Sequence, residues 1–172
     1  MNFAVTPLSR QAIRELANRI RKIAGGPDYF NILEFIELIL PQIDSEFQGL
    51  EVVEDKDLLD CYAKAYPDEG RIVVKNSVYE NAEKGIGRDR FTLTHELAHY
   101  ILHSSSRVEY ARHGTGKIPS YCNPEWQANT FAGELLVPVD IAKTHTVEEI
   151  KKCCGVSYTV AEIQKKEATK RL

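Results

Sequence analysis

The sequence predicts one α+β domain in which helices surround a small antiparallel sheet. At 172 residues the chain is long enough for one hydrophobic core and too short for two large domains. Helical periodicity dominates both ends of the chain, whereas short β-type patterns occur only after residue 51. We therefore expect N-terminal helices in residues 1–50, a hairpin and two long helices in 51–143, and a C-terminal helical subdomain in 144–172.

Composition excludes several classes of protein. The net charge of −3 gives no reason to expect a nucleic acid as the main partner. The N-terminus has no basic stretch followed by an apolar run, and the longest apolar run, Phe30 to Leu40, is too short for a membrane span. None of the four cysteines forms a C-x-x-C pair, so we expect reduced thiols and a cytoplasmic protein without membrane contact.

The first fifty residues predict two helices. Pro7-Leu8-Ser9 begins the first, which continues with apolar side chains at helical spacing and ends at Gly25-Gly26-Pro27. The second is expected from about Tyr29 to Leu40. Proline disfavours a helix interior, so Pro41 should end it.

Short strands follow. Val52 and Val53 give a weak β pattern, while Cys61 to Tyr66 and Arg71 to Lys75 give stronger ones. The turn sequence Pro67-Asp68-Glu69-Gly70 lies between the two stronger runs, which predicts an antiparallel hairpin. A polar, glycine-containing loop is expected from Asn81 to Gly87.

Two longer helices are predicted in the second half of the chain. The first runs from about Arg90 to His103 and is followed by an irregular loop over residues 104–122. Asn123 as N-cap and a proline at the first helical position begin the second helix. It should end at Val137, because Pro138 disfavours helical geometry in the residue before it.

The C-terminus predicts two short helices with helix-turn-helix proportions. Thr146-Val147-Glu148-Glu149 is a capping box, Gly155 should end the first helix, and Ser157 should begin the second. From residue 151 onward there are six Lys or Arg and two Glu, a local excess of four positive charges. Direct binding to DNA, or to a protein partner without proteolysis, is therefore an alternative function, although most such charge runs are solvated helix faces.

The first long helix carries the motif His95-Glu96-Leu97-Ala98-His99. At 100° per residue, the two histidines and the glutamate share one face and the apolar residues fill the other. The histidines are about 6 Å apart along the axis, close enough to bind one Zn²⁺. His103 is about 12 Å from His95, too far to join them, so it either supports a ligand or packs at the helix end.

A catalytic zinc needs a third protein ligand and one open position. Glu125 is favoured because Asn129, four residues later, could hydrogen-bond the outer ring nitrogen of a ligand histidine. An acid in the first helical turn is also favourable beside the helix dipole, so position alone does not settle its role. The side chains downstream of the motif that could supply this third ligand are Glu109, His113, Cys122, Glu125, Glu134 and His145.

Two blocks of sequence resemble the ImmA/IrrE family of bacterial metallopeptidases. They are RFTLTHELAHYILH at residues 90–103 and EWQANTFAGELLVP at residues 125–138, and together they cover 28 residues. The family more often has Gly where this chain has Ala98, and Met where it has Val137. Neither difference removes a metal-binding side chain.

The resemblance implies a zincin-like metallopeptidase with named site residues. His95, His99 and Glu125 would be the zinc ligands, and Glu96 the base that takes a proton from the attacking water. The resemblance also implies a narrow protein substrate. We expect an Xre-like helix-turn-helix repressor encoded nearby, in a mobile element, prophage, stress or toxin–antitoxin locus. A purely structural zinc site is disfavoured, because closed sites are usually rich in cysteine.

The sequence also offers candidates for two further roles. A second donor to the tetrahedral oxyanion could come from any of four side chains: Tyr100, His103, His113 and Tyr121. An extended substrate could pair with the strand Arg71 to Lys75, through Ile72, Val73 and Val74. The alternative for that strand is an ordinary core strand that buries one face of the hairpin.

Overall fold

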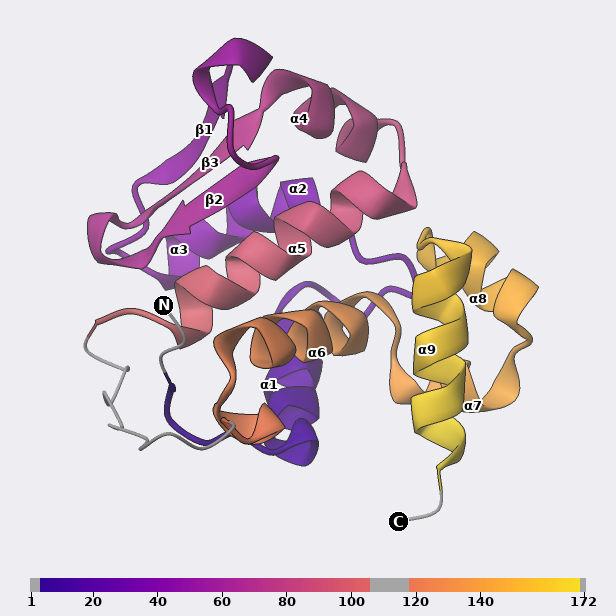
Figure 1. Cartoon of the computed structure of the whole chain (residues 1–172). Helices are drawn as coiled ribbons and strands as arrows, with labels where there is room; N and C mark the ends of the chain where they lie inside the picture. The colour runs from indigo at the N-terminus through magenta and orange to yellow at the C-terminus, as the bar shows by residue number, and fades with distance from the viewer. Residues whose placement is uncertain (1–3, 106–117, 171–172) are drawn as a thin grey trace.

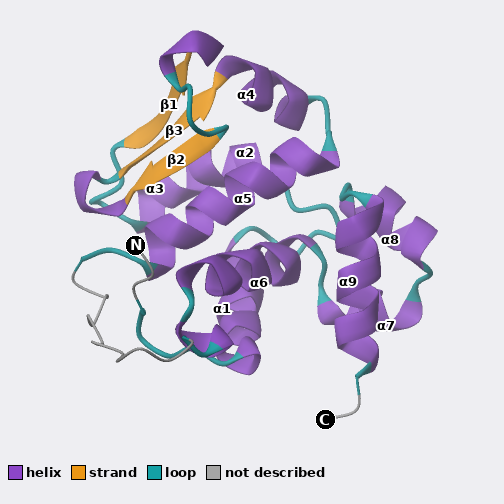
Figure 2. Ribbon diagram, viewed as in Figure 1, coloured by secondary structure: helices purple, strands orange, loops and turns teal. Residues whose placement is uncertain are grey.

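The fold is α+β and mostly helical, with one small sheet (Figures 1 and 2). The computed structural model describes residues 4–105 and 118–170. Its helices and strands are α1 Arg10–Ile23, α2 Ile32–Glu34, a π-helical turn Phe35–Ile39, α3 Leu40–Ile43, β1 Gly49–Val53, β2 Ala63–Tyr66, β3 Arg71–Lys75, α4 Asn76–Glu83, α5 Gly87–Leu102, α6 Pro124–Leu136, α7 Val139–Thr144, α8 Val147–Cys154 and α9 Tyr158–Thr169.

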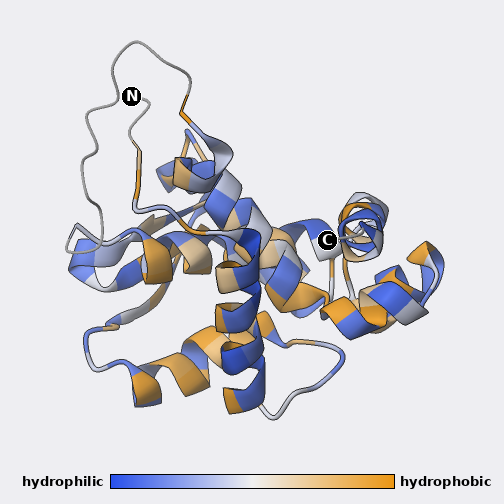
Figure 3. Cartoon of the chain, turned by 90° about the horizontal axis from the view of Figure 1, so that it is seen from below, coloured by the Kyte–Doolittle hydropathy of each residue, from blue (hydrophilic) through white to orange (hydrophobic). Residues whose placement is uncertain are grey.

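The long helix α5 lies at the centre of the molecule. The sheet packs against it on one side and α6 on another, with α1 packed against α6 (Figure 1). The facing side chains are apolar and buried, among them Leu93 and Leu97 on α5 and Phe131 and Leu135 on α6. Hydrophobic and hydrophilic residues alternate along the helices (Figure 3). Within the described residues, no helix is both long and apolar enough to cross a membrane.

The sheet is mixed, so the expectation of an antiparallel sheet is only partly right. The predicted hairpin is present: β2 pairs antiparallel with β3, with Ala65 opposite Ile72. However, β1 pairs parallel with the other edge of β3, which gives the order β1-β3-β2. After β1 the chain forms β2 at the opposite edge of the sheet. It then turns back and places β3 between them, parallel to β1 and antiparallel to β2.

The second N-terminal helix differs from its prediction. Helical structure begins at Ile32 and continues past Pro41 to Ile43. A proline lacks the N–H that an α-helix interior requires, and its ring crowds the carbonyl four residues earlier. Here a π-helical turn over Phe35–Ile39, separated from Pro41 by Leu40 alone, changes the hydrogen-bond spacing, so the proline does not end the helix.

The region before α5 is more helical than predicted. Helix α4 occupies Asn76–Glu83, part of which we expected to be a loop, and α5 begins at Gly87 instead of Arg90. Neither helix has a side-chain cap at its N-terminus, so the usual start signals are absent. Helix α7 was missed for the same reason: its N-cap is Pro138.

The other capping predictions are confirmed. The side chain of Asn123 accepts hydrogen bonds from the first turn of α6, and Val137 is the C-cap of that helix. Thr146 forms the predicted capping box at the start of α8, Gly155 ends α8 in the left-handed conformation, and Ser157 caps α9. These residues act on their own backbone, which is why sequence alone locates them.

A buried arginine joins the metal-motif helix to the C-terminal helices. Arg90 is 1% exposed, and its guanidinium donates to the carbonyl oxygens of Phe30, Cys154 and Gly155. It also lies 3.9 Å from the centroid of the Tyr29 ring. The start of α5 is thereby fixed to the end of α8 and to the segment before α2.

We expect Gly155→Ala to destabilise the fold by more than about 2 kcal/mol. Gly155 has φ of +61°, and an added Cβ would lie 2.4 Å from a Tyr29 ring carbon and 2.5 Å from Arg90 Nη1. Gly25→Ala is the matched control, because Gly25 has φ of +87° with nothing within 4 Å of an added Cβ. Urea unfolding of both variants measures the difference. Equal losses would mean that the contact with Arg90 and Tyr29 is not close.

Candidate metal centre

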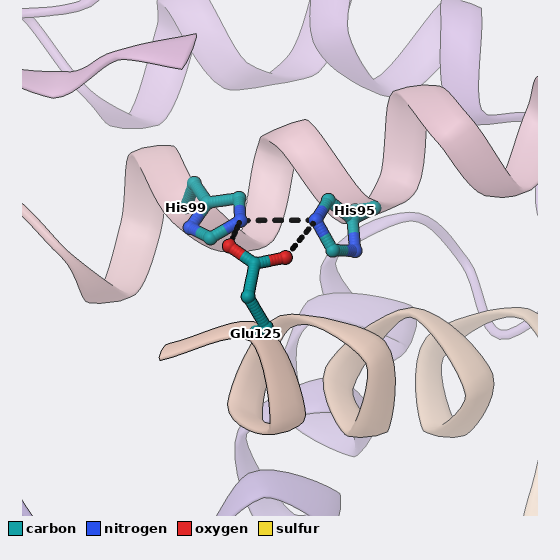
Figure 4. A group of neighbouring side chains, drawn as sticks. All are labelled: His95, His99 and Glu125. Carbon is teal, nitrogen blue, oxygen red and sulfur yellow. Dashed lines mark hydrogen bonds and ion pairs between the residues drawn. The ribbon is translucent and has the colours of Figure 1, made fainter. Parts of the chain in front are cut away.

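Two helices bring three metal-binding side chains together (Figure 4). Helix α5 presents His95 and His99 one turn apart, and the first turn of α6 presents Glu125 to both. The two histidine Nε2 atoms are 3.0 Å apart. Each Nε2 lies 3.3 Å from one oxygen of the Glu125 carboxylate. One potential ligand atom from each residue lies within 4.8 Å of the other two.

The chemistry of this group fits a metal cation. Burial is the main reason that the pKa of His99 falls to about 3, with His95 and His103 contributing, so its ring is neutral at neutral pH and can coordinate a metal. Two imidazole nitrogens and one carboxylate form a three-ligand set that leaves one position open for water or substrate. The side chain of Glu125 is 64% exposed, so the group can be reached from solvent.

Glu96 lies beside this group and touches the sheet. Its Oε2 accepts a hydrogen bond of 2.7 Å from the backbone N–H of Ala65 in β2. Burial raises the pKa of Glu96, and the Ala65 N–H and the nearby His95 oppose that shift. A partly buried carboxylate with a raised pKa is a better proton acceptor than a solvated one.

Both histidines are held through their outer ring nitrogens. The Nδ1 of His95 lies 2.9 Å from Asn129 Oδ1 on α6. The Nδ1 of His99 lies 2.9 Å from His103 Nδ1, so His103 touches a member of the group without joining it. Burial lowers the pKa of His103, whose ring is therefore also neutral at neutral pH.

Gln127 continues this chain of contacts and was not among the residues predicted from the sequence. Its Oε1 lies 2.9 Å from His103 Nε2, and its Nε2 donates to two backbone carbonyls. Gln127 is two residues from Glu125, which turns it away from the Glu125 face of α6. A search along that face therefore passes over it. A glutamine that is 1% exposed on a helix is the signal that marks it in the structure.

The remaining predicted donors lie elsewhere or outside the described residues. Tyr100 is buried, and its hydroxyl donates to Asp44 Oδ2 at 2.8 Å, so it belongs to the packing of α5 against the N-terminal part of the chain. The side chain of Tyr121 is exposed, and its backbone oxygen accepts from Gln127. His113 lies outside the described residues.

The other candidates for third ligand are not in the group. Glu134 is buried and forms ion pairs of 2.7 Å with Arg10 and 2.8 Å with Arg14. Cys122 is a buried free thiol, and the ring of His145 contacts Thr144. Glu109, like His113, lies outside the described residues.

The strand predicted to receive a substrate is the wrong one. Arg71–Lys75, which contains Ile72, Val73 and Val74, is β3, and β3 pairs with β1 on one side and β2 on the other. Both of its hydrogen-bonding edges are used, so it cannot accept another strand. The strand next to Glu96 is β2, which is an edge strand of this sheet.

Fold and site together define a class of protein: an α+β protein with an H-E-x-x-H helix and a carboxylate supplied by a second helix, as in metallopeptidases. The chain belongs to the ImmA/IrrE family. Residues 48–163, more than half of the chain, match the family Peptidase_M78, described as the IrrE N-terminal-like domain. The match includes Glu96 and all three members of the candidate metal group.

The fold is similar to that of solved structures, among them a Mycobacterium tuberculosis transcriptional regulator, with a TM-score of 0.53 and 17% identity. The similarity covers 88% of this chain and 45% of that one, so this chain spans less than half of the regulator's length. At this level of identity the likeness concerns the fold alone. No curated protein matches the chain.

Proposed function

We propose that this protein is a zinc-dependent endopeptidase of zincin type. The observation that carries the proposal is the position of Glu96, a carboxylate with a raised pKa that lies between the His–His–Glu group and an edge strand. Zn²⁺ held by His95, His99 and Glu125 would supply Lewis acidity, which polarises a scissile carbonyl and makes water more acidic.

Glu96 performs the proton transfers in this mechanism. Its carboxylate accepts a proton from the attacking water and then donates that proton to the nitrogen of the leaving amine. The N–H of Ala65 holds one carboxylate oxygen, which leaves the other oxygen to act as base. A single side chain can thus serve as base and then as acid within one turnover.

We propose that an extended segment of the substrate pairs with β2. The backbone of Lys75 donates to Tyr62, so the alternation of an antiparallel pair turns Ala63 and Ala65 toward the open edge. Ala65 already contacts Glu96 from this edge. A peptide added here by main-chain pairing would run directly past the proposed base.

The proposed substrate is a helix-turn-helix repressor encoded near the gene for this protein, whose cleavage would switch on transcription of its locus. We expect purified protein with zinc to cut such a repressor at one or few positions, and a chelator to abolish the cut. Added zinc should restore it. Mass spectrometry of the products locates the cleavage position. Cleavage that continues at full rate after complete metal removal would contradict the proposal.

Direct DNA binding by α8 and α9 is the weaker candidate. Some of the basic residues are already engaged: Lys170 pairs with Glu167, which Arg10 also approaches, and Lys165 donates to the backbone of Lys143. Two of the six basic side chains are thus already held by other groups of this chain. A gel shift at physiological salt distinguishes DNA binding from proteolysis.

A further inference from the structure

The two ends of the Gln127 amide can be told apart by what surrounds them. One end lies 2.9 Å from the carbonyl oxygen of Thr6 and 2.8 Å from that of Tyr121. Carbonyl oxygens only accept hydrogen bonds, so this end must be the NH₂ group. The other end, which faces His103, must therefore be the amide oxygen.

This orientation determines which nitrogen of His103 carries its proton. The Nε2 of His103 lies 2.9 Å from the Gln127 oxygen, which can only accept, so Nε2 must be the N–H. A neutral imidazole has one N–H, so Nδ1 of His103 has a lone pair. Since Nδ1 of His103 lies 2.9 Å from Nδ1 of His99, the proton between them belongs to His99.

The consequence reaches the metal group. With its proton on Nδ1, the neutral ring of His99 has its lone pair on Nε2, the atom that lies 3.3 Å from Glu125. We propose that Gln127 is a positioning residue: through His103 it selects the tautomer in which His99 offers Nε2 to a metal ion. The backbone of residues 6 and 121 thereby sets the state of a ligand on α5.

His95 is contacted directly by an amide side chain, with no second histidine between them. Its Nδ1 lies 2.9 Å from Asn129, which is exposed, whereas Gln127 is 1% exposed and held at both ends. A fixed tautomer removes a competing ring state that would otherwise have to be converted before the metal binds. Partners of this type typically change metal affinity by about 10- to 100-fold.

The direct test needs no substitution. Nitrogen-15 NMR of the histidine rings in the metal-free wild-type protein at neutral pH reports the tautomer of each ring. We expect His99 in the Nδ1–H form and His103 in the Nε2–H form. A dominant Nε2–H form of His99 overturns the proposal.

The second test compares two buried glutamines, Gln127 on α6 and Gln164 on α9. Gln127→Met removes the amide that faces His103, whereas Gln164→Met removes an amide that lies against Gly133, at the far end of α6. Zinc affinity is measured by competition with a chelator, and stability by urea unfolding. We expect affinity to fall about 10- to 100-fold in Gln127→Met and to stay unchanged in Gln164→Met. A folded Gln127→Met protein with wild-type affinity would refute the role of Gln127.

This inference rests on the proposed metal site, yet the two can fail separately. If the wild-type protein bound no zinc, the proposed function would be lost, while the ring tautomers of the metal-free protein would still test the effect of Gln127. If zinc bound but His99 had the other tautomer, the positioning role would be lost and the metal site would remain. If Gln127→Met does not fold, the wild-type NMR spectrum decides.

Discussion

Replacing Glu96 with Gln is expected to slow cleavage by about 10²- to 10⁴-fold while zinc stays bound. Glutamine has the same shape, and its amide oxygen can still accept the hydrogen bond from Ala65. An amide cannot take a proton from water at neutral pH, so the loss should appear in the rate. Cleavage of the repressor and zinc content are the two measurements.

The same variant tests the path of the substrate. A repressor that binds to Glu96→Gln but is not cut should slow hydrogen exchange at the amide of Ala63, on the open edge of β2. Glu148→Gln is the matched control for the effect of Glu96→Gln on cleavage, because it makes the same substitution at an exposed residue on α8. Unchanged cleavage by Glu96→Gln would show that another group is the base.

Two glutamates of α6 should respond to substitution in opposite ways. We expect Glu125→Ala to weaken zinc binding by more than about 100-fold, which exceeds the typical effect of removing a side chain that only hydrogen-bonds a metal ligand. Stability should change little, because the Glu125 side chain is 64% exposed. We expect Glu134→Gln to keep zinc affinity and lose about 2–3 kcal/mol of stability. It removes the negative charge that faces Arg10 and Arg14, although both arginines remain partly exposed and Arg10 also approaches Glu167, which moderates the cost.

Chelator competition and urea unfolding, applied to both variants, separate the two roles. Both residues are glutamates on one helix, but Glu125 is exposed beside two histidines and Glu134 is buried beside two arginines. If Glu134→Gln lost zinc affinity as severely as Glu125→Ala, the assignment of Glu125 as the third ligand would be contradicted. Equal stability losses would likewise contradict the structural role of Glu134.

Local chemistry explains which parts of the fold were predictable. Ser9, Asn123 and Thr146 cap helices through contacts within their own first turn, so a few residues of sequence are enough to locate each start. The hairpin of β2 and β3 follows from the turn between them. In the site, the spacing of His95 and His99 on one helix is equally local.

Strand order and the supporting contacts depend on distant parts of the chain. No local pattern states that β1 pairs with β3, so the open edge was assigned to the wrong strand. Glu125 was favoured by its spacing from Asn129, but only the family resemblance decided it. Gln127 donates to the backbone of Thr6, which is 121 positions away in sequence. Sequence periodicity cannot predict a contact over that distance.

X-ray absorption at the zinc edge, combined with zinc stoichiometry, tests the metal centre most directly. We predict one zinc per chain, bound by two imidazoles and carboxylate or water oxygens at about 2.0–2.2 Å, with no sulfur neighbour. The triple variant His95→Ala, His99→Ala, Glu125→Ala should bind none. A folded wild-type protein without zinc at saturating concentration, or a zinc with sulfur neighbours at about 2.3 Å, would contradict the site.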